Sequence, residues 1–116
     1  MIGLILQYKP RQGNALVKLN YEIFGRIIKT ISAGEKVYYY QKGLLHNVQY
    51  KKLINGKYFI RDIKLKEDIK RICDKYCNSY KLFEDVRIFK EEELTTGLKC
   101  RMEMASEKNY KVRKWV

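Results

Sequence analysis

Short runs rich in β-branched and aromatic residues, separated by turn residues, predict β-strands through most of residues 1–63. Turns are predicted at residues 10–14 and at Ser32-Ala33-Gly34, and Gly25 fits a β-bulge. The expected strands cover residues 3–9, 15–20, 22–31, 35–41, 48–54 and 57–63. The first half of the chain is therefore expected to form an antiparallel sheet or a partly open barrel.

The dipeptide Asn55-Gly56 predicts a two-residue hairpin turn, because both central residues of a type I′ turn need positive φ. In this register Lys52 lies opposite Phe59, and alternate residues share a face. One face then carries Val48, Tyr50, Lys52, Ile54, Lys57, Phe59, Arg61 and Ile63. Since unpaired charges are costly to bury, we expect Tyr50 and Phe59 to be at least partly exposed there. Val48 and Ile63, the apolar residues at the ends of this face, are expected to pack under a helix.

After residue 63 the apolar residues recur with a helical period instead of a period of two. They form one stripe of Leu65, Ile69, Ile72, Cys73, Tyr76 and Tyr80. This stripe predicts an amphipathic helix over residues 64–80. Glu67 and Asp68 suit its N-terminal turns, and Asp62 is a candidate cap. The order strand, helix, strand over residues 57–90 resembles half of a ferredoxin-like fold, although many folds share that rhythm.

The last third of the chain alternates again and predicts two or three further strands. Residues 85–90 and 98–104 both alternate, and residues 109–116 fit an edge strand or a basic arm. The sequence thus predicts an α+β fold with one helix, in a single domain over residues 1–116. Five or more strands with one helix leave a sheet face or edge uncovered, which favours a homodimer.

The charge of the chain is strongly positive and unevenly distributed. There are 25 Lys and Arg against 13 Asp and Glu, a formal net charge of +12. Residues 1–60 hold ten bases and two acids, whereas residues 61–116 hold fifteen bases and eleven acids. A lysine-rich composition alone would not leave only one half short of acids. The imbalance favours a polyanionic partner.

The cysteines suggest a reducing compartment and no metal site. Three cysteines, an odd number, argue against a disulfide scaffold. Cys73 and Cys77 lie four residues apart on the predicted helix, whereas structural zinc sites use paired ligands at shorter spacing. We therefore expect partly buried thiols, with no metal and no cofactor. The longest apolar run, residues 1–6, is too short for a membrane span or a signal peptide, so a cytoplasmic protein without membrane contact is expected.

The sequence gives little support for catalysis. His46 is the only histidine, and nothing in its spacing joins it to a cysteine nucleophile. A metal-independent ribonuclease is the one enzymatic alternative, with His46 as general acid or base near Tyr40, Tyr50 and Lys42. We expect a protein that is not an enzyme.

Aromatic residues interleaved with bases on predicted strands favour a nucleic-acid-binding protein. Single-stranded nucleic acid is held by rings that stack on bases and by lysines that follow the phosphates. We therefore predict binding of RNA or single-stranded DNA on a basic, tyrosine-rich β-surface. The alternative is a small binding or inhibitor module from a mobile element, which captures an acidic protein surface or a nucleotide-like anion. The predicted contact residues are Arg11, Tyr38, Tyr40, Lys42, His46, Tyr50, Lys51, Lys52, Lys57, Phe59 and Arg61.

Overall fold

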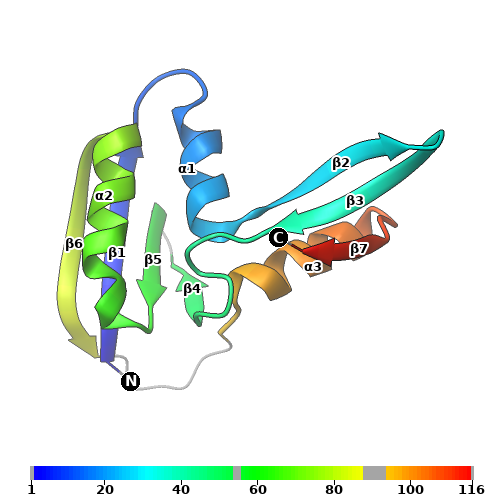
Figure 1. Ribbon diagram of the computed structural model, residues 1–116. Coiled ribbons are helices and arrows are strands. Elements are labelled where there is room, and N and C mark those ends of the chain that lie inside the picture. Colours follow the sequence, from blue (N-terminus) through cyan, green and yellow to red (C-terminus); the bar gives the residue numbers. More distant parts are fainter. Residues whose placement is uncertain (1, 54–55, 88–93, 116) are drawn as a thin grey trace.

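The computed structural model describes residues 2–53, 56–87 and 94–115, which form two β-sheets and three α-helices (Figure 1). The predicted α+β class is confirmed, and neither sheet closes into a barrel. The described part of the chain extends over 49 × 33 × 23 Å, because one sheet projects from the body of the molecule as an arm. No helix in these described ranges is long and apolar enough to span a membrane.

The body is built on a four-stranded sheet, sheet A, in which all neighbouring strands are antiparallel. In spatial order its strands are β4 (Tyr50–Lys52), β5 (Lys57–Ile60), β1 (Ile2–Pro10) and β6 (Cys77–Arg87). Helices α1 (Ala15–Phe24) and α2 (Lys66–Tyr76) both lie on one face of this sheet (Figure 1). Along the chain these elements follow the β-α-β-β-α-β order of ferredoxin-like folds.

The arm interrupts this order between α1 and β4. A hairpin of β2 (Arg26–Ser32) and β3 (Glu35–Gln41) joins β7 (Val112–Trp115), which runs parallel to β3, to form sheet B. Helix α3 (Gly97–Glu107) lies beside the arm (Figure 1). The turn at Ala33-Gly34 uses positive φ at both residues, 51° and 80°. The strands predicted at residues 3–9 and 35–41 and the edge strand at the C-terminus are thus confirmed.

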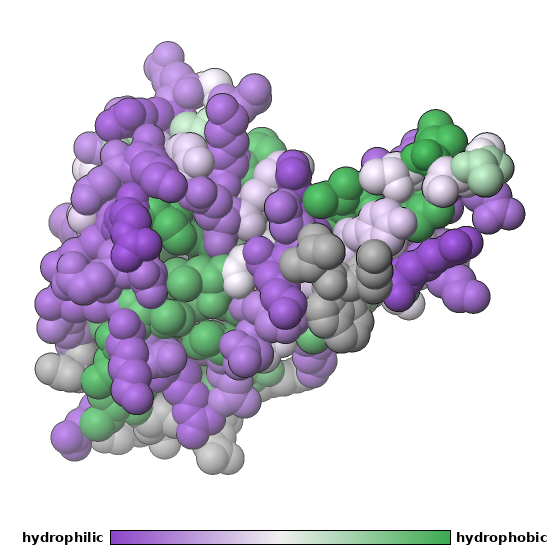
Figure 2. Space-filling model, in the orientation of Figure 1, coloured by the Kyte–Doolittle hydropathy of each residue, from purple (hydrophilic) through white to green (hydrophobic). Residues whose placement is uncertain are grey.

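The main hydrophobic core lies between sheet A and the two helices that cover it. Alternate residues of β1 meet residues spaced four apart on α1 and α2, as the strand and helix periods require. Its fully buried members include Leu4, Leu6, Leu19, Ile23, Ile60 and Ile69. On the face shown in Figure 2, hydrophilic side chains cover most of the body, and hydrophobic ones show between the helices and along the arm.

Two segments predicted as strands are helices. Residues 15–24 form α1, because Leu19 and Ile23 lie on one helix face and reach the core. Residues 98–104 belong to α3, which buries Gly97 and Ala105, eight residues apart. Thr96 caps this helix, and its hydroxyl accepts a hydrogen bond from the Lys99 N–H (3.2 Å). The β-rich run at residues 15–20 and the alternation of apolar residues at 98–104 misled the prediction, and the expectation of a single helix is wrong.

The helix predicted over residues 64–80 is confirmed for Lys66–Tyr76 but is shorter than expected. Its last predicted residues enter β6, where Ser79 pairs with Lys9 and Tyr80 with Tyr8. A short 3₁₀ turn, Ile63–Leu65, precedes the helix, and the Asp62 Oδ1 caps it by accepting from the Lys64 N–H (2.9 Å). Pairing with β1 therefore decides where the helix ends. The predicted strand at 85–90 lies within β6 as far as Arg87, and its remaining residues lie outside the described ranges.

The hairpin of β4 and β5 forms as predicted, but its register differs by one residue. Lys51 pairs with Phe59, and Lys52 pairs with Tyr58. Tyr50 and Phe59 therefore lie on opposite faces of sheet A, because a slip of one residue reverses every side chain. The predicted turn residue Asn55 lies outside the described residues. Of the two residues expected to pack under a helix, Val48 contacts the core, whereas Ile63 is 47% exposed.

Close backbone packing fixes the arm to the body. Gly25 ends α1, Gly43 follows β3 and Gly97 begins α3, and a Cβ at any of them would collide with backbone atoms of a neighbouring segment. The Leu45 N–H donates to the Ile23 carbonyl (2.8 Å), and the Gly97 N–H donates to the Leu45 carbonyl (2.7 Å). The orientation of the arm relative to α1 and α3 is thus set by backbone contacts at this junction.

Candidate nucleic-acid interface

A groove of about 320 Å³ lies where α1, the β2–β3 hairpin and α3 meet. We call it the basic tyrosine groove. Among the residues that the structure describes, its lining contains four cations, three tyrosines and no acidic residue. The lining residues are Tyr21, Arg26, Ile27, Lys29, Tyr38, Arg101, Met104, Ala105, Lys108 and Tyr110.

Local structure explains why these side chains converge. Lys29 on β2 lies directly opposite Tyr38 on β3, so the two residues share a face of sheet B. Arg101, Ala105 and Lys108 are spaced four and then three residues apart, which places them along one side of α3. The bases of the groove therefore come from β2 and from α3 with its cap residue Lys108, while α1 and β3 each contribute a tyrosine.

The rings and cations of the groove are held in place by contacts with one another. The rings of Tyr38 and Tyr110 stack with centroids 4.2 Å apart and planes 10° apart. The Tyr110 N–H donates to the Ala105 carbonyl (2.8 Å), which fixes the segment after α3. Arg26 lies over the Tyr21 ring, with its guanidinium carbon 4.9 Å from the ring centroid. This preorganisation reduces the entropy lost when a ligand binds.

No acidic side chain that the structure describes neutralises the positive charge of the groove. Within the described ranges, none of its four cations forms a salt bridge. The Arg101 Nε donates to the Gly25 carbonyl (2.9 Å), and the Arg26 Nε donates to the Gln41 side chain (2.6 Å), so both partners are neutral. Tyr21 and Tyr110 are 39% and 37% exposed. The groove thus combines accessible rings with uncompensated positive charge.

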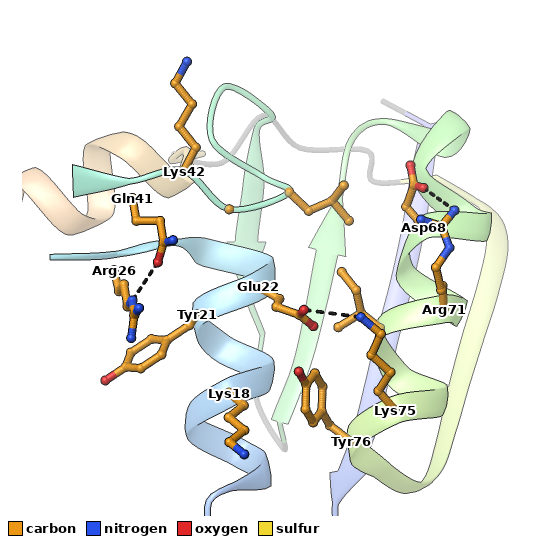
Figure 3. A pocket seen from close by; sticks show the side chains of 13 residues that line it. Lys18, Tyr21, Glu22, Arg26, Gln41, Lys42, Asp68, Arg71, Lys75 and Tyr76 are labelled. Carbon is orange, nitrogen blue, oxygen red and sulfur yellow. Dashed lines mark hydrogen bonds and ion pairs between the residues drawn. The ribbon is translucent and has the colours of Figure 1, made fainter. Parts of the chain in front are cut away.

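A second groove of about 600 Å³ shares two lining residues, Tyr21 and Arg26, with the first. It lies between α1, α2 and the segment after β3 (Figure 3). We call it the interhelical groove. Its two acids are paired with bases: Glu22 lies 3.5 Å from the Lys75 Nζ, and Asp68 lies 2.9 Å from the Arg71 Nη2. Three further cations line it, namely Lys18, Arg26 and Lys42.

The structure places three of the predicted contact residues in the interior. Tyr40 and Phe59 are 0% exposed and Tyr50 is 5% exposed. Burial raises the pKa of both tyrosine hydroxyls. A ring without an accessible face cannot stack on a base, so the prediction that Tyr50 and Phe59 are partly exposed on a stacking surface is wrong. The one-residue change of register places Phe59 on the far side of the sheet instead.

Other predicted residues lie on different surfaces. Tyr38 lines the basic tyrosine groove, and Lys42 lines the interhelical groove, with its amino group pointing away from the helices (Figure 3). Lys51 and Lys57 lie on the face of sheet A that is turned away from α1 and α2. Lys52 lies on the helix-facing side, beside a separate cavity. The predicted single β-surface is thus divided among several places.

The two predicted arginines are at the periphery. Arg61 donates to the side chain of Gln49, just beyond β5. Arg11, in the turn after β1, donates to the Asp74 carbonyl (3.5 Å). Neither arginine lines the basic tyrosine groove.

His46 lies against a buried tyrosine. Its ring is 5.5 Å from the Tyr40 ring, and its Nδ1 is 3.4 Å from the Tyr40 Oη. Burial, and secondarily the charge of Lys42, lower the pKa of His46, which favours the neutral ring. Tyr50, suggested as a partner for ribonuclease chemistry, is in the main core. Among the described residues, no group of three or more His, Cys, Asp and Glu side chains is arranged to hold a metal ion.

Most residues of the groove were not predicted from the sequence, and Tyr21 and Arg101 lie on helices where the sequence predicted strands. Spacing on a helix would have placed three of them, Arg101, Ala105 and Lys108, on one side of α3. No local signal brings α1 beside the hairpin, however. The missed residues with charged or aromatic side chains are Tyr21, Arg26, Lys29, Arg101, Lys108 and Tyr110.

The cysteines differ in accessibility, which gives a simple test of the fold. Cys73 and Cys77 are buried and Cys100 is partly exposed. Burial, together with the neighbouring Cys77, raises the pKa of Cys73 from 9.0 to about 12. Because the thiolate is the reactive form, we expect iodoacetamide at about pH 8 to modify Cys100 and to spare Cys73 until denaturant is added. Mass spectrometry of the native protein would contradict this if Cys73 reacted as fast as Cys100.

Comparison of the chain with protein-family models, with curated proteins and with solved structures finds no match. The geometry of the grooves is therefore the basis for a functional proposal.

Proposed function

We propose that this protein binds single-stranded nucleic acid, RNA or DNA, in the basic tyrosine groove. The observation that carries the proposal is the composition of the groove: among the described residues, four cations that form no salt bridge line it together with three tyrosines, and no acid does. Lysine and arginine neutralise phosphates, and tyrosine rings stack on bases for about 1–3 kcal/mol each.

The chemistry favours a single strand over a duplex. The rings of Tyr38 and Tyr110 lie inside a groove between the arm and α3, and a base must leave its stack to reach them. Bases in a duplex have both faces covered, whereas bases in a single strand are free to stack on protein. The interhelical groove offers further phosphate contacts, because it shares Arg26 and adds Lys18 and Lys42.

Neutralising two groove lysines is expected to weaken binding in a salt-dependent way. For Lys29→Gln with Lys108→Gln, the slope of log affinity against log salt should fall by about 1.4, since each lost phosphate contact removes about 0.7. Lys66→Gln with Lys70→Gln on α2 removes the same charge outside both grooves and should have little effect. Fluorescence anisotropy with labelled single-stranded RNA, single-stranded DNA and duplex, at several salt concentrations, measures the affinity and the salt slope of both double variants. Equal losses for the two pairs would refute the groove as the binding site.

Removing one ring tests stacking separately from charge. Tyr110→Ala leaves every lysine in place, and it should weaken single-strand binding by about 1–3 kcal/mol. Tyr110 is 37% exposed and stacks on Tyr38, so the free energy of unfolding should fall by about 1–2 kcal/mol, which leaves the protein folded. An acidic protein surface as ligand would depend on the lysines but not on this ring. Unchanged nucleic-acid affinity in the Tyr110→Ala variant would therefore count against the proposal.

A further inference from the structure

Sheet A has a face that no described helix covers. Both α1 and α2 pack on the other face, where the alternate residues Leu4 and Leu6 of β1 meet them (Figure 1). The intervening residues point to the opposite side, because successive side chains of a strand alternate. On the three longest strands of sheet A these are Ile5, Gln7, Lys9, Lys57, Phe59, Ser79, Lys81 and Phe83.

The registers arrange these residues in two rows across the strands. Ile5 pairs with both Phe59 and Phe83, which gives an apolar row. Two residues further along β1, Gln7 pairs with both Lys57 and Lys81, which gives a basic row. Aromatic and cationic side chains thus lie next to each other in parallel lines on one surface.

Exposure shows which residues of this face can meet a ligand. Phe83 is 47% exposed, and Lys9 and Lys81 are also exposed. Phe59 is fully buried, and its ring lies where a side chain at residue 3 would project: a Cβ on Gly3 would be 2.7 Å from two of its ring atoms. Phe59 therefore supports the surface, and Phe83 presents an accessible ring.

The charge of this face selects the partner. Lys9, Lys57 and Lys81 are positive, and the face carries no acid among the side chains that the structure describes. Glu84, the neighbour of Phe83 in β6, points to the other side and pairs with Lys66 of α2. A single nucleic-acid strand is a linear polyanion that carries flat bases. Its phosphates complement the basic row, and its bases complement the aromatic row beside it.

We propose that the face of sheet A opposite α1 and α2 is a second binding surface for single-stranded nucleic acid, with Phe83 as the stacking ring and Lys9, Lys57 and Lys81 as phosphate contacts. Its ligand class rests on the proposed function, but none of its residues belongs to either groove. The sheet separates this face from the interhelical groove on the helix side. One molecule can therefore hold two strand segments at once.

Variants of the two surfaces distinguish the two proposals. Phe83→Ala should weaken the affinity of the sheet A surface for a short labelled single-stranded oligonucleotide by about tenfold. Lys57→Gln with Lys81→Gln should lower the slope of log affinity against log salt at the sheet A surface by about 1.4. Lys66→Gln with Lys70→Gln, which changes the same charge on the helix side, serves as the matched control. Thermal unfolding of each variant establishes that it is folded.

A bridging experiment measures simultaneous occupation. Donor-labelled and acceptor-labelled short oligonucleotides, both in excess, should show energy transfer with the wild-type protein and lose it when Phe83, Lys57 and Lys81 are replaced together. Tyr110→Ala should reduce transfer through the other surface. If the sheet variants bind and bridge like the wild type, the second surface is refuted, whatever the groove variants do. If only the sheet variants lose affinity, the second surface stands and the groove proposal fails.

Sedimentation velocity without nucleic acid tests whether a second copy of the chain binds this face of sheet A instead. The proposal expects Phe83→Ala to leave the sedimentation coefficient unchanged. A dimer that dissociates in the Phe83→Ala variant would overturn the proposal in favour of self-association through this face.

Discussion

Replacing Gly25 with alanine is expected to lower the free energy of unfolding by about 2–6 kcal/mol. Gly25 has φ 83° and ψ −179°, a backbone conformation that is essentially restricted to glycine and costs other residues about 1–3 kcal/mol. A Cβ there would also lie 2.5 Å from the Gln41 carbonyl oxygen and 2.8 Å from the Tyr40 hydroxyl. Relieving such a collision in a packed junction costs about a further 1–3 kcal/mol. Urea denaturation measures the total.

Gly13 provides the control for this substitution. It also has φ 83°, but nothing lies within 4 Å of a Cβ built on it. Gly13→Ala should therefore cost only about 1 kcal/mol, the penalty of a left-handed backbone. The difference between the two variants measures the close approach of β3 to the end of α1. Similar losses for Gly13→Ala and Gly25→Ala would show that the junction is not tightly packed.

Replacing Phe59 with alanine is expected to destabilise the protein by about 3–5 kcal/mol through the cavity that it leaves. Phe59 is 0% exposed and packs over Gly3 on the face of sheet A away from the helices. In a protein of ordinary stability, about 5–15 kcal/mol, such a loss populates unfolded molecules. Weaker nucleic-acid binding by this variant would then report unfolding and not a lost contact.

Phe83 is the natural comparison for Phe59. Both phenylalanines pair with Ile5 on the same face of the sheet, but Phe83 is 47% exposed. Phe83→Ala should cost about 1 kcal/mol, because much of its ring is already in water. Thermal and urea unfolding of the two variants give the comparison directly. A Phe59→Ala variant as stable as Phe83→Ala would place Phe59 at the surface after all.

Several elements follow from local sequence alone. The strand at Glu35–Gln41 depends on its run of valine and tyrosines, which prefer a pleated surface, and it begins and ends where the sequence predicts. The helix at Lys66–Tyr76 depends on its apolar stripe and on the acids of its first turn. The hairpin of β4 and β5 and the excess of positive charge in residues 1–60 are likewise visible without the structure.

The register of that hairpin was not predictable from the same reasoning. Both faces of the two strands carry aromatic and basic residues, so sliding one strand by a residue changes little in the local pattern. The pairing of β5 with β1 decides between the alternatives, since it aligns Ile60 with Leu4 and turns both into the core. The burial of Tyr50 and the position of Phe59 follow from that long-range contact.

By itself, the sequence determined the α+β class, the central helix, the main hairpins and the strongly positive charge of this protein. Only the tertiary structure decided that residues 15–24 and 97–107 are helical, because their apolar residues fit either period until they meet a packing partner. It also decided where the bases and rings gather. Arg26, Tyr38 and Arg101 come from different elements and line one groove, because the close backbone contacts at Gly25, Gly43 and Gly97 bring α1, the arm and α3 together.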